Sequence, residues 1–145
     1  MSEVIIVDYD CVNLFSLARA LDRFDAIYKV TNDPDIIRKA SKVILPGVGA
    51  YSIGMEHLQK QHLAQALEEV VGSGNPLMGI CLGMQLLVES SDEFGQHNGL
   101  GLIPGKTTLL APSEKVKVPH IGWNSLLIPE TQQQESWNNS VLKDI

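Results

Sequence analysis

The sequence predicts an α/β fold, an open and mostly parallel sheet with helices on both faces. Short apolar runs that end at a charge, a proline or a glycine alternate with stretches of helical periodicity. This alternation implies right-handed crossovers between parallel strands, with helices covering both faces of the sheet. The length of 145 residues suits one domain with a hydrophobic core, so we assign residues 1–145 to a single domain.

The first half of the chain supplies the clearest elements. Residues 4–9, VIIVDY, form a continuous apolar run that ends in a charge, as a central parallel strand does. An amphipathic helix follows with Asn13 as its N-cap, and its apolar stripe consists of Leu14, Leu17, Ala18 and Leu21. Further strands are predicted at residues 26–31, 41–47 and 76–80. Further helices are predicted at residues 33–40, 55–74 and 84–91.

The pattern changes after residue 90. Residues 91–101 are polar and contain glycines, which predicts a loop. Short strands, interpreted as an antiparallel addition, are predicted at residues 106–111, 116–120 and 124–128. The polar stretch 129–139 predicts another loop.

Composition and charge exclude several classes of function. The net charge is −6 and no basic block is present, so we expect no nucleic-acid partner. No apolar run approaches the roughly 18 residues of a membrane span, and the N-terminus does not resemble a signal peptide. Two cysteines are too few for a disulfide framework, which favours a cytoplasmic location. We find no metal-ligand cluster and no phosphate loop, so we expect no metal and no cofactor.

Cys81 stands in the sequence GICLG, between Gly79 and Gly83. The form G-x-C-x-G between a strand and a helix matches the nucleophile elbow, with cysteine in place of serine. Such a turn presents its side chain at the carboxyl edge of the sheet, and N–H groups after it can stabilise an oxyanion. The alternative is a small buried cysteine between packing glycines. The strand–turn–helix context favours the nucleophile.

A second glycine cluster, LPGVGAYS at residues 45–52, follows the third predicted strand. Gly47 and Gly49 permit unusual backbone angles beside the same sheet edge, so this segment could direct an N–H group at a developing oxyanion. An ordinary strand-to-helix turn is the alternative.

Several motifs together resemble one family. DYDCVNL, LPGVGAY, GICLGMQLL, GLGLIPG and KVPHIGWN are similar, in order and spacing, to the glutamine amidotransferase subunits of imidazole glycerol phosphate synthase. These are class I glutaminases with a Cys-His-Glu triad. The resemblance covers essentially the whole chain, and the PGVGA and VPHIGWN motifs are its most specific parts.

The resemblance implies roles for individual residues. Cys81 would be the nucleophile that attacks the carboxamide of glutamine and releases ammonia. The oxyanion and glutamine-binding residues would be Gly47, Val48, Gly49, Leu82 and Gln85. The interface with a (β/α)₈-barrel synthase subunit, in a heterodimer, would include Asn13, His120, Trp123 and Asn124. The ammonia would pass through the barrel to make imidazole glycerol phosphate in histidine biosynthesis.

The first loop departs from the family pattern. The family reads D-Y-G-x-G-N-L, whereas Asp10 and Val12 replace the two glycines here. A positive φ is costly at Val12 and tolerable at Asp10, so the loop is predicted to be reshaped. This departure leaves open a second hypothesis, in which the same chemistry supplies ammonia for another amination, such as that of a surface-polysaccharide sugar.

The triad base is the other departure. The family carries a His-Pro-Glu motif well beyond PHIGWN, and no such motif occurs in these residues. The four histidines are His57, His62, His97 and His120, of which only His120 is a weak candidate for the base. We therefore expect an amidotransferase domain that lacks its C-terminal part, exposes a sheet edge and has no useful activity alone. A degenerate, non-catalytic module is a third hypothesis.

Overall fold

The computed structural model describes residues 3–111, 118, 119 and 121–128. The chain divides into two compact units, Met1–Leu109 and Leu110–Ile145. All the helices and strands found among the described residues lie in the first unit. The described residues of the second unit are irregular.

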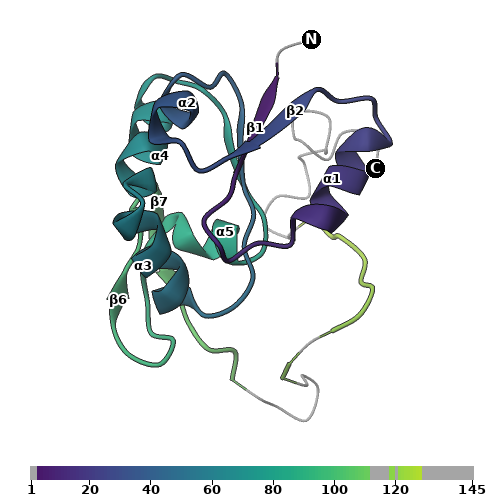
Figure 1. Ribbon diagram of the computed structural model, residues 1–145. Coiled ribbons are helices and arrows are strands. Elements are labelled where there is room, and N and C mark those ends of the chain that lie inside the picture. The colour runs from purple at the N-terminus through teal and green to yellow at the C-terminus, as the bar shows by residue number, and fades with distance from the viewer. Residues whose placement is uncertain (1–2, 112–117, 120, 129–145) are drawn as a thin grey trace. The chain divides into compact units, whose positions relative to one another are not determined.

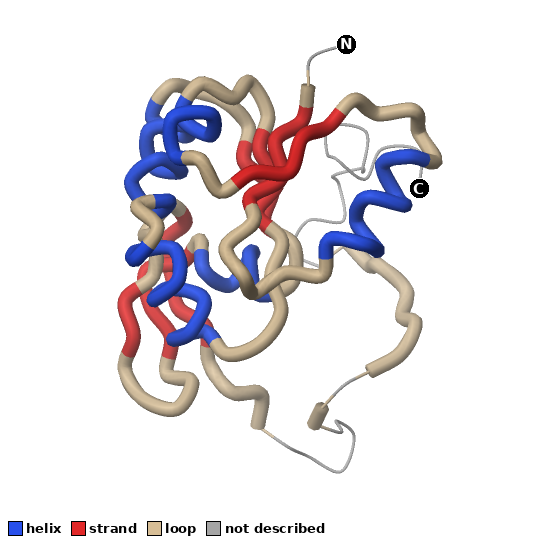
Figure 2. Tube along the Cα trace, in the orientation of Figure 1, coloured by secondary structure: helices blue, strands red, loops and turns tan. Residues whose placement is uncertain are grey.

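A four-stranded parallel sheet forms the centre of the first unit (Figures 1 and 2). Its strands, in the order β2-β1-β3-β4, are Tyr28–Thr31, Val4–Val7, Val43–Leu45 and Leu77–Gly79. The predicted parallel sheet is confirmed. Strands β1 and β3 are central and almost wholly buried, which explains why their sequences are continuous apolar runs. Strand β4 lies at the edge of this sheet, and Met78 at its centre is 54% exposed.

Helices cover both faces of this sheet, as the sequence predicts. Helix α1 (Leu14–Asp22) lies on one face, and α2 (Pro34–Arg38) and α4 (Leu63–Gly72) lie on the other (Figures 1 and 2). The main hydrophobic core is on the side of α2 and α4. There Ile5, Val7 and Leu45 pack among buried side chains of α4, α3 (Tyr51–Lys60) and α5 (Leu82–Leu86). Burial of these side chains is the main force that holds the layers together.

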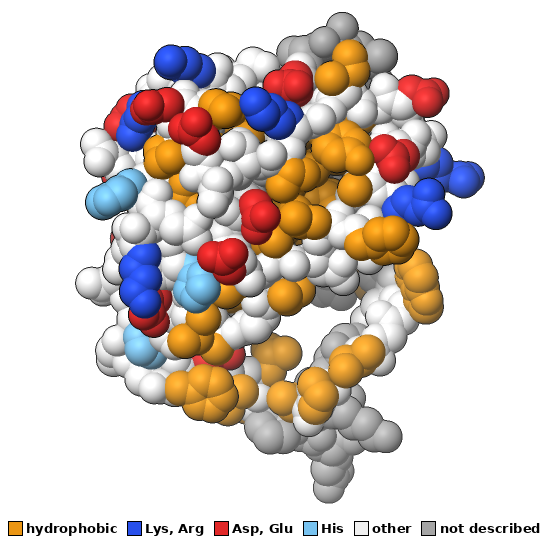
Figure 3. All heavy atoms as spheres, in the orientation of Figure 1, with side chains coloured by type: hydrophobic (Ala, Val, Ile, Leu, Met, Phe, Trp, Pro, Cys, Tyr) orange, Lys and Arg blue, Asp and Glu red, His pale blue; other side chains and the backbone are white. Residues whose placement is uncertain are grey.

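Helix α1 covers its face loosely. Its predicted cap is confirmed, because Asn13 Oδ1 accepts a hydrogen bond from the Ser16 N–H at 3.4 Å. All residues of α1 are described and none is fully buried. Phe15 and Phe24 are largely exposed, and the Arg19 guanidinium lies 5.5 Å from the Phe15 ring centre. Figure 3 shows apolar side chains gathered between the sheet and α1.

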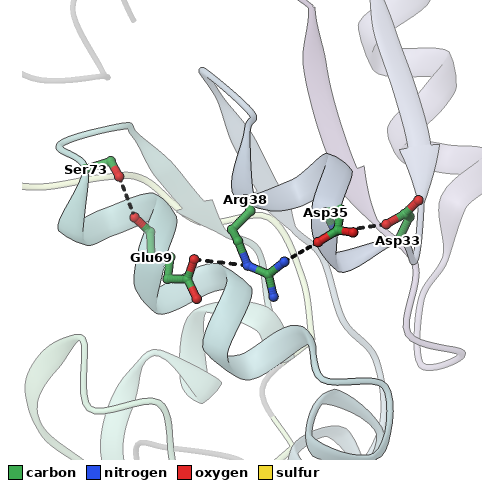
Figure 4. A network of polar contacts seen from close by, with 5 residues as sticks. All are labelled: Asp33, Asp35, Arg38, Glu69 and Ser73. Atoms are coloured by element: carbon green, nitrogen blue, oxygen red, sulfur yellow. Dashed lines mark hydrogen bonds and ion pairs between the residues drawn. The ribbon is translucent and has the colours of Figure 1, made fainter.

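Polar contacts connect α2 to α4 on the other face (Figure 4). Asp33 caps α2, as predicted, by accepting the Asp35 N–H at 2.9 Å. Arg38 pairs with Asp35 in its own helix and places Nε 3.0 Å from Glu69 Oε2 of α4. These side chains are partly exposed, so each pair contributes at most about 1 kcal/mol and the apolar contacts dominate.

The predicted helix at residues 55–74 is two helices, so that prediction is wrong. Helix α3 (Tyr51–Lys60) and α4 are separated by His62, which has φ 58°. The apolar stripe of α3 includes Leu58, and that of α4 begins at Leu63. At about 100° per residue, Leu63 would stand about 140° away from Leu58 on a straight helix. A change of direction lets both stripes reach the core.

The predicted helix at residues 84–91 is also wrong in its second half. Helix α5 spans only Leu82–Leu86, and strand β5 (Val88–Ser91) follows it. Strand β5 pairs with β6 (His97–Asn98) in antiparallel and with β7 (Ile103–Thr107) in parallel, in a second sheet of order β6-β5-β7. Pairing with residues distant in sequence therefore overrides the local helical pattern.

The remaining predictions for the second half are partly corrected. The predicted loop at 91–101 contains β6. The strand predicted at 106–111 is wrong in its bounds and pairing: β7 spans Ile103–Thr107, residues 108–111 are irregular, and β7 pairs with β5 in parallel rather than antiparallel. The strand predicted at 124–128 is wrong, because these described residues are irregular. Most of the strand predicted at 116–120 lies outside the described residues. No helix in the described part of the chain is long and apolar enough to cross a membrane.

Candidate active site

Cys81 occupies a strained turn between β4 and α5. Its φ and ψ are 55° and −119°, a conformation that L-residues rarely adopt. The Ile80 N–H donates to the Leu45 carbonyl at 3.0 Å, and the Gly83 N–H donates back to the Ile80 carbonyl at 3.0 Å. These bonds tighten the chain around Cys81, whose side chain is exposed. Such strain costs about 1–3 kcal/mol and occurs preferentially at functional sites.

The glycines on either side of Cys81 are required by close packing. A Cβ at Gly79 would lie 2.6 Å from the Cα of Met84, in α5. A Cβ at Gly83 would lie 1.9 Å from the carbonyl oxygen of Leu45, at the end of β3. The helix therefore presses directly against two strands, as the elbow pattern predicts.

The PGVG segment passes over the start of α5. A Cβ at Gly47 would lie 2.8 Å from the Gly83 nitrogen and 2.2 Å from Tyr9 Oη. Gly49 has φ 103°, which favours glycine. The Val48 N–H donates to the carbonyl of Cys11 at 2.8 Å. The Val48 N–H is therefore already used in a hydrogen bond within the protein.

A pocket of about 310 Å³ opens beside Cys81. It is lined by Asn13, Ser16, Leu17, Pro46, Gly47, Val48, Ile80 and Cys81. The fold thus brings the candidate nucleophile together with the PGVG segment and the start of α1. The lining is mostly apolar, with the thiol, Asn13 and Ser16 as polar side chains.

The other predicted glutamine-binding residues follow Cys81 on α5. The side chain of Leu82 is buried, and its N–H is the first of the helix, where no intrahelical acceptor exists. Gln85 is half-buried, and its N–H donates to the Cys81 carbonyl at 3.2 Å. Helix α5 thus begins with the backbone N–H groups that directly follow Cys81 in the chain.

The predicted interface residues divide between the two units. Asn13 is exposed at the start of α1 in the first unit. Trp123 and Asn124 are exposed in the second unit, where Asn124 Oδ1 accepts the Ser125 N–H at 3.0 Å. His120 lies outside the described residues.

No described histidine lines the pocket beside Cys81. His57, on α3, places Nδ1 3.5 Å from Asp10 Oδ2. His62 is exposed at the break between α3 and α4. His97 lies in β6 with Nε2 buried. Within the described residues, the structure therefore brings no candidate base into this pocket.

Comparison with known proteins identifies the family. A model of the CobB/CobQ-like glutamine amidotransferase domain matches residues 3–133. The chain belongs to the glutamine amidotransferase family.

Two similar curated proteins within this family are both named as HisH subunits of imidazole glycerol phosphate synthase. Imidazole glycerol phosphate synthase subunit HisH 1 of Legionella pneumophila (strain Lens) is 44% identical over 150 residues, which cover 100% of this chain and 69% of that protein. Subunit HisH of Listeria monocytogenes serotype 4b (strain CLIP80459) is 45% identical over 128 residues, which cover 88% of this chain and 62% of that protein. These alignments confirm the resemblance seen in the motifs.

A solved glutamine amidotransferase structure supports the fold alone. It superimposes with a TM-score of 0.58 at 18% sequence identity, over 68% of this chain and 52% of that chain. The α/β architecture with a mostly parallel sheet is thus that of the amidotransferase family.

Tyr9 lies beside the candidate site and was not predicted from the sequence. Its ring is fully buried, and Oη has no hydrogen-bond partner among the described residues. Burial, followed by the charges of Cys11 and Cys81, raises the pKa of Tyr9 far above its usual value. In the sequence, Tyr9 stands two residues after the end of β1. A tyrosine there is equally compatible with an exposed side chain, so this position alone could not identify it.

Replacing Tyr9 by phenylalanine is expected to raise the free energy of unfolding by about 1 kcal/mol, because an unpaired buried hydroxyl is removed. The folded state also keeps the Tyr9 proton at a pH where the unfolded chain, with a pKa near 10, loses it. Wild-type stability should therefore fall as pH rises above about 10, and Tyr9→Phe should lack this part of the fall. Urea denaturation of both proteins at pH 7 and pH 10.5 (about half a unit above that pKa) measures the difference. A parallel fall in both would contradict the assignment.

Glu93 is a second residue that sequence reasoning missed. Its Oε2 accepts the Tyr51 N–H at 2.6 Å and so caps α3, which begins just after the PGVG segment. A carboxylate at a helix N-terminus is stabilised by the helix dipole. The two residues are 42 positions apart, so no local pattern connects them.

Proposed function

We propose that this chain is the glutaminase subunit of an imidazole glycerol phosphate synthase, acting in the cytoplasm in histidine biosynthesis. The observation that carries the proposal is the strained, exposed Cys81 at the turn from β4 into α5, beside the PGVG segment. The HisH names of the curated relatives support the assignment to this synthase.

The proposed chemistry is acyl transfer through Cys81. The sulfur attacks the carboxamide carbon of glutamine, the C–N bond breaks, and the thiol proton leaves with the nitrogen as ammonia. Water then hydrolyses the glutamyl thioester, which releases glutamate and restores the thiol. The residues of this chain supply the nucleophile and the oxyanion donors, and no metal or cofactor enters the reaction.

The oxyanion would be held by backbone N–H groups. The Leu82 N–H is the donor nearest Cys81 along the chain, and the PGVG segment, Gly47 to Gly49, supplies the second. The Val48 N–H is engaged by Cys11 in this structure, so its peptide must rotate before it can donate. Gly49 and Gln85 are proposed to hold the glutamine.

The proposed partner is a (β/α)₈-barrel synthase subunit, which would receive the ammonia within a heterodimer. Asn13, Trp123 and Asn124, with His120, are proposed to contact it. The exposure of the first three is compatible with this role. A large aromatic side chain such as Trp123 is a frequent energetic centre of interfaces.

A second acceptor is favoured by one specific feature of the chain. Asp10 and Val12 occupy the loop between β1 and α1, where the family pattern has glycines, and Asp10 does adopt a positive φ of 68°. A reshaped loop there would suit a different partner, for example one that aminates a sugar. Histidine-pathway neighbours in the genome favour the synthase, and polysaccharide genes favour the alternative.

An activated substrate tests whether Cys81 can be acylated. Within residues 1–145 we propose that no general base serves Cys81, so ammonia release from glutamine should stay at the level of Cys81→Ala. A γ-glutamyl p-nitrophenyl ester needs no proton on its leaving group. It should give a burst of about one p-nitrophenolate per wild-type chain and none with Cys81→Ala. Absence of the burst in the wild type would favour the non-catalytic module, and Cys81-dependent ammonia release would refute the proposed inactivity.

A further inference from the structure

The loop between β1 and α1, residues 8–13, is held on α3 by a side-chain contact. Asp10 Oδ2 accepts a hydrogen bond from Gln61 Nε2 at 2.9 Å and lies 3.5 Å from His57 Nδ1. His57 lies in the second half of α3, and Gln61 is the C-cap of that helix. Asp10 is held in place by its own N–H, which donates to Asp8 Oδ1 at 3.2 Å.

The same loop also holds the candidate oxyanion segment. The residue after Asp10 is Cys11, whose carbonyl accepts the Val48 N–H at 2.8 Å. Only Gly49 and Ala50 separate Val48 from the first residue of α3. The loop therefore bridges the two ends of α3: Asp10 contacts its C-terminal end, and Cys11 contacts the segment that enters it.

The two loop contacts, the segment from Val48 to Ala50 and helix α3 together form a closed ring. Helix α3 connects Gln61 rigidly to Ala50. Tyr9 belongs to the loop, and its fully buried side chain anchors the loop in the core. Gly49, with φ 103°, joins Val48 to α3 and has the backbone freedom that lets this segment move. Release of the Asp10 carboxylate from α3 would therefore leave the Cys11 carbonyl freer to move away from the Val48 N–H.

We propose that Asp10 is a positioning residue for the oxyanion segment. Its carboxylate holds the loop on α3, and the loop thereby keeps the Cys11 carbonyl on the Val48 N–H. The consequence for catalysis rests on the proposed function. An N–H that is bonded to Cys11 cannot donate to an oxyanion at Cys81, so the tether controls how often the segment is free to do so. A glycine at position 10 would have no side chain with which to make this contact.

Three variants isolate the tether. Gln61→Leu removes the donor and keeps a residue that suits a helix. Asp10→Asn keeps the shape and the tolerance of a positive φ but removes the charge. Gln59→Leu is the matched control, because Gln59 is exposed on the same helix and makes none of the loop contacts described above.

Amide hydrogen exchange of Val48, followed by NMR on the ¹⁵N-labelled chain, reads the proposed effect directly. Loss of one hydrogen bond should accelerate Val48 exchange about fivefold in Gln61→Leu. The acceleration should be smaller in Asp10→Asn and absent in Gln59→Leu. Urea denaturation should show equal global stability, so that the change is local. Unchanged Val48 exchange in both Gln61→Leu and Asp10→Asn would overturn the proposal.

The rate of Cys81 labelling connects the tether to the reaction. With the electrophilic glutamine analogue 6-diazo-5-oxo-L-norleucine, Gln61→Leu should label about fivefold faster than wild type, because the N–H donor is more often free. Gln59→Leu should label at the wild-type rate. Faster Val48 exchange without faster labelling would overturn the positioning role. Absence of labelling in every protein would count against the proposed function itself, and Val48 exchange would then decide the tether alone.

Discussion

Gly83→Ala should lower the free energy of unfolding by about 3 kcal/mol, a large part of the 5–15 kcal/mol that a domain of this size has. The added Cβ would lie 1.9 Å from the Leu45 carbonyl oxygen, 2.7 Å from the Leu45 carbonyl carbon and 3.1 Å from the Pro46 carbonyl carbon. These are backbone atoms at the end of a central strand, and they cannot yield as a flexible side chain would. Helix α5 must then move away from β3 and take the turn at Cys81 with it.

Gly72→Ala is the matched control for this prediction. Gly72 ends α4, and an added Cβ there would meet nothing within 4 Å. Alanine in a helix should be neutral or stabilising, by up to about 1 kcal/mol. Urea denaturation followed by circular dichroism measures both variants. If Gly83→Ala proved as stable as Gly72→Ala, the close packing of the elbow described here would be wrong.

The two cysteines should differ strongly in reactivity. Cys81 is exposed at its turn, whereas Cys11 is half-buried. Burial, together with the adjacent Asp10 carboxylate, raises the pKa of the Cys11 thiol and so lowers its thiolate fraction. Iodoacetamide should therefore modify Cys81 at least about tenfold faster than Cys11. Peptide mapping of partially modified protein gives both rates in one sample, with Cys81→Ala as the assignment control.

Local sequence signals were sufficient for the parallel sheet and for the elbow. The buried strands are short apolar runs. The glycines that close packing requires lie only two residues on either side of Cys81, so a local motif reveals them. The second sheet was not predictable in this way, because β5 follows a helix whose apolar pattern continues into the strand. Residues 88–91 form a strand rather than the end of a helix because they pair with β6 and β7.

The contacts that support the site were also not predictable from the sequence, because each joins residues that are far apart in the chain. Asp10 meets Gln61 across 51 positions, and Glu93 meets Tyr51 across 42. Polar residues in loops carry no periodicity that would indicate such partners. The sequence did mark Asp10 as unusual, and the structure supplies a contact that a glycine could not make.

The site of reaction with a glutamine analogue tests the central claim most directly. The purified chain is treated with 6-diazo-5-oxo-L-norleucine, digested and mapped by mass spectrometry, with and without excess glutamine. The structure and the family predict label on Cys81 and none on Cys11, with glutamine slowing the reaction at Cys81. Label spread equally over both cysteines, or label on Cys81 that glutamine does not slow, would contradict a glutamine site at this turn.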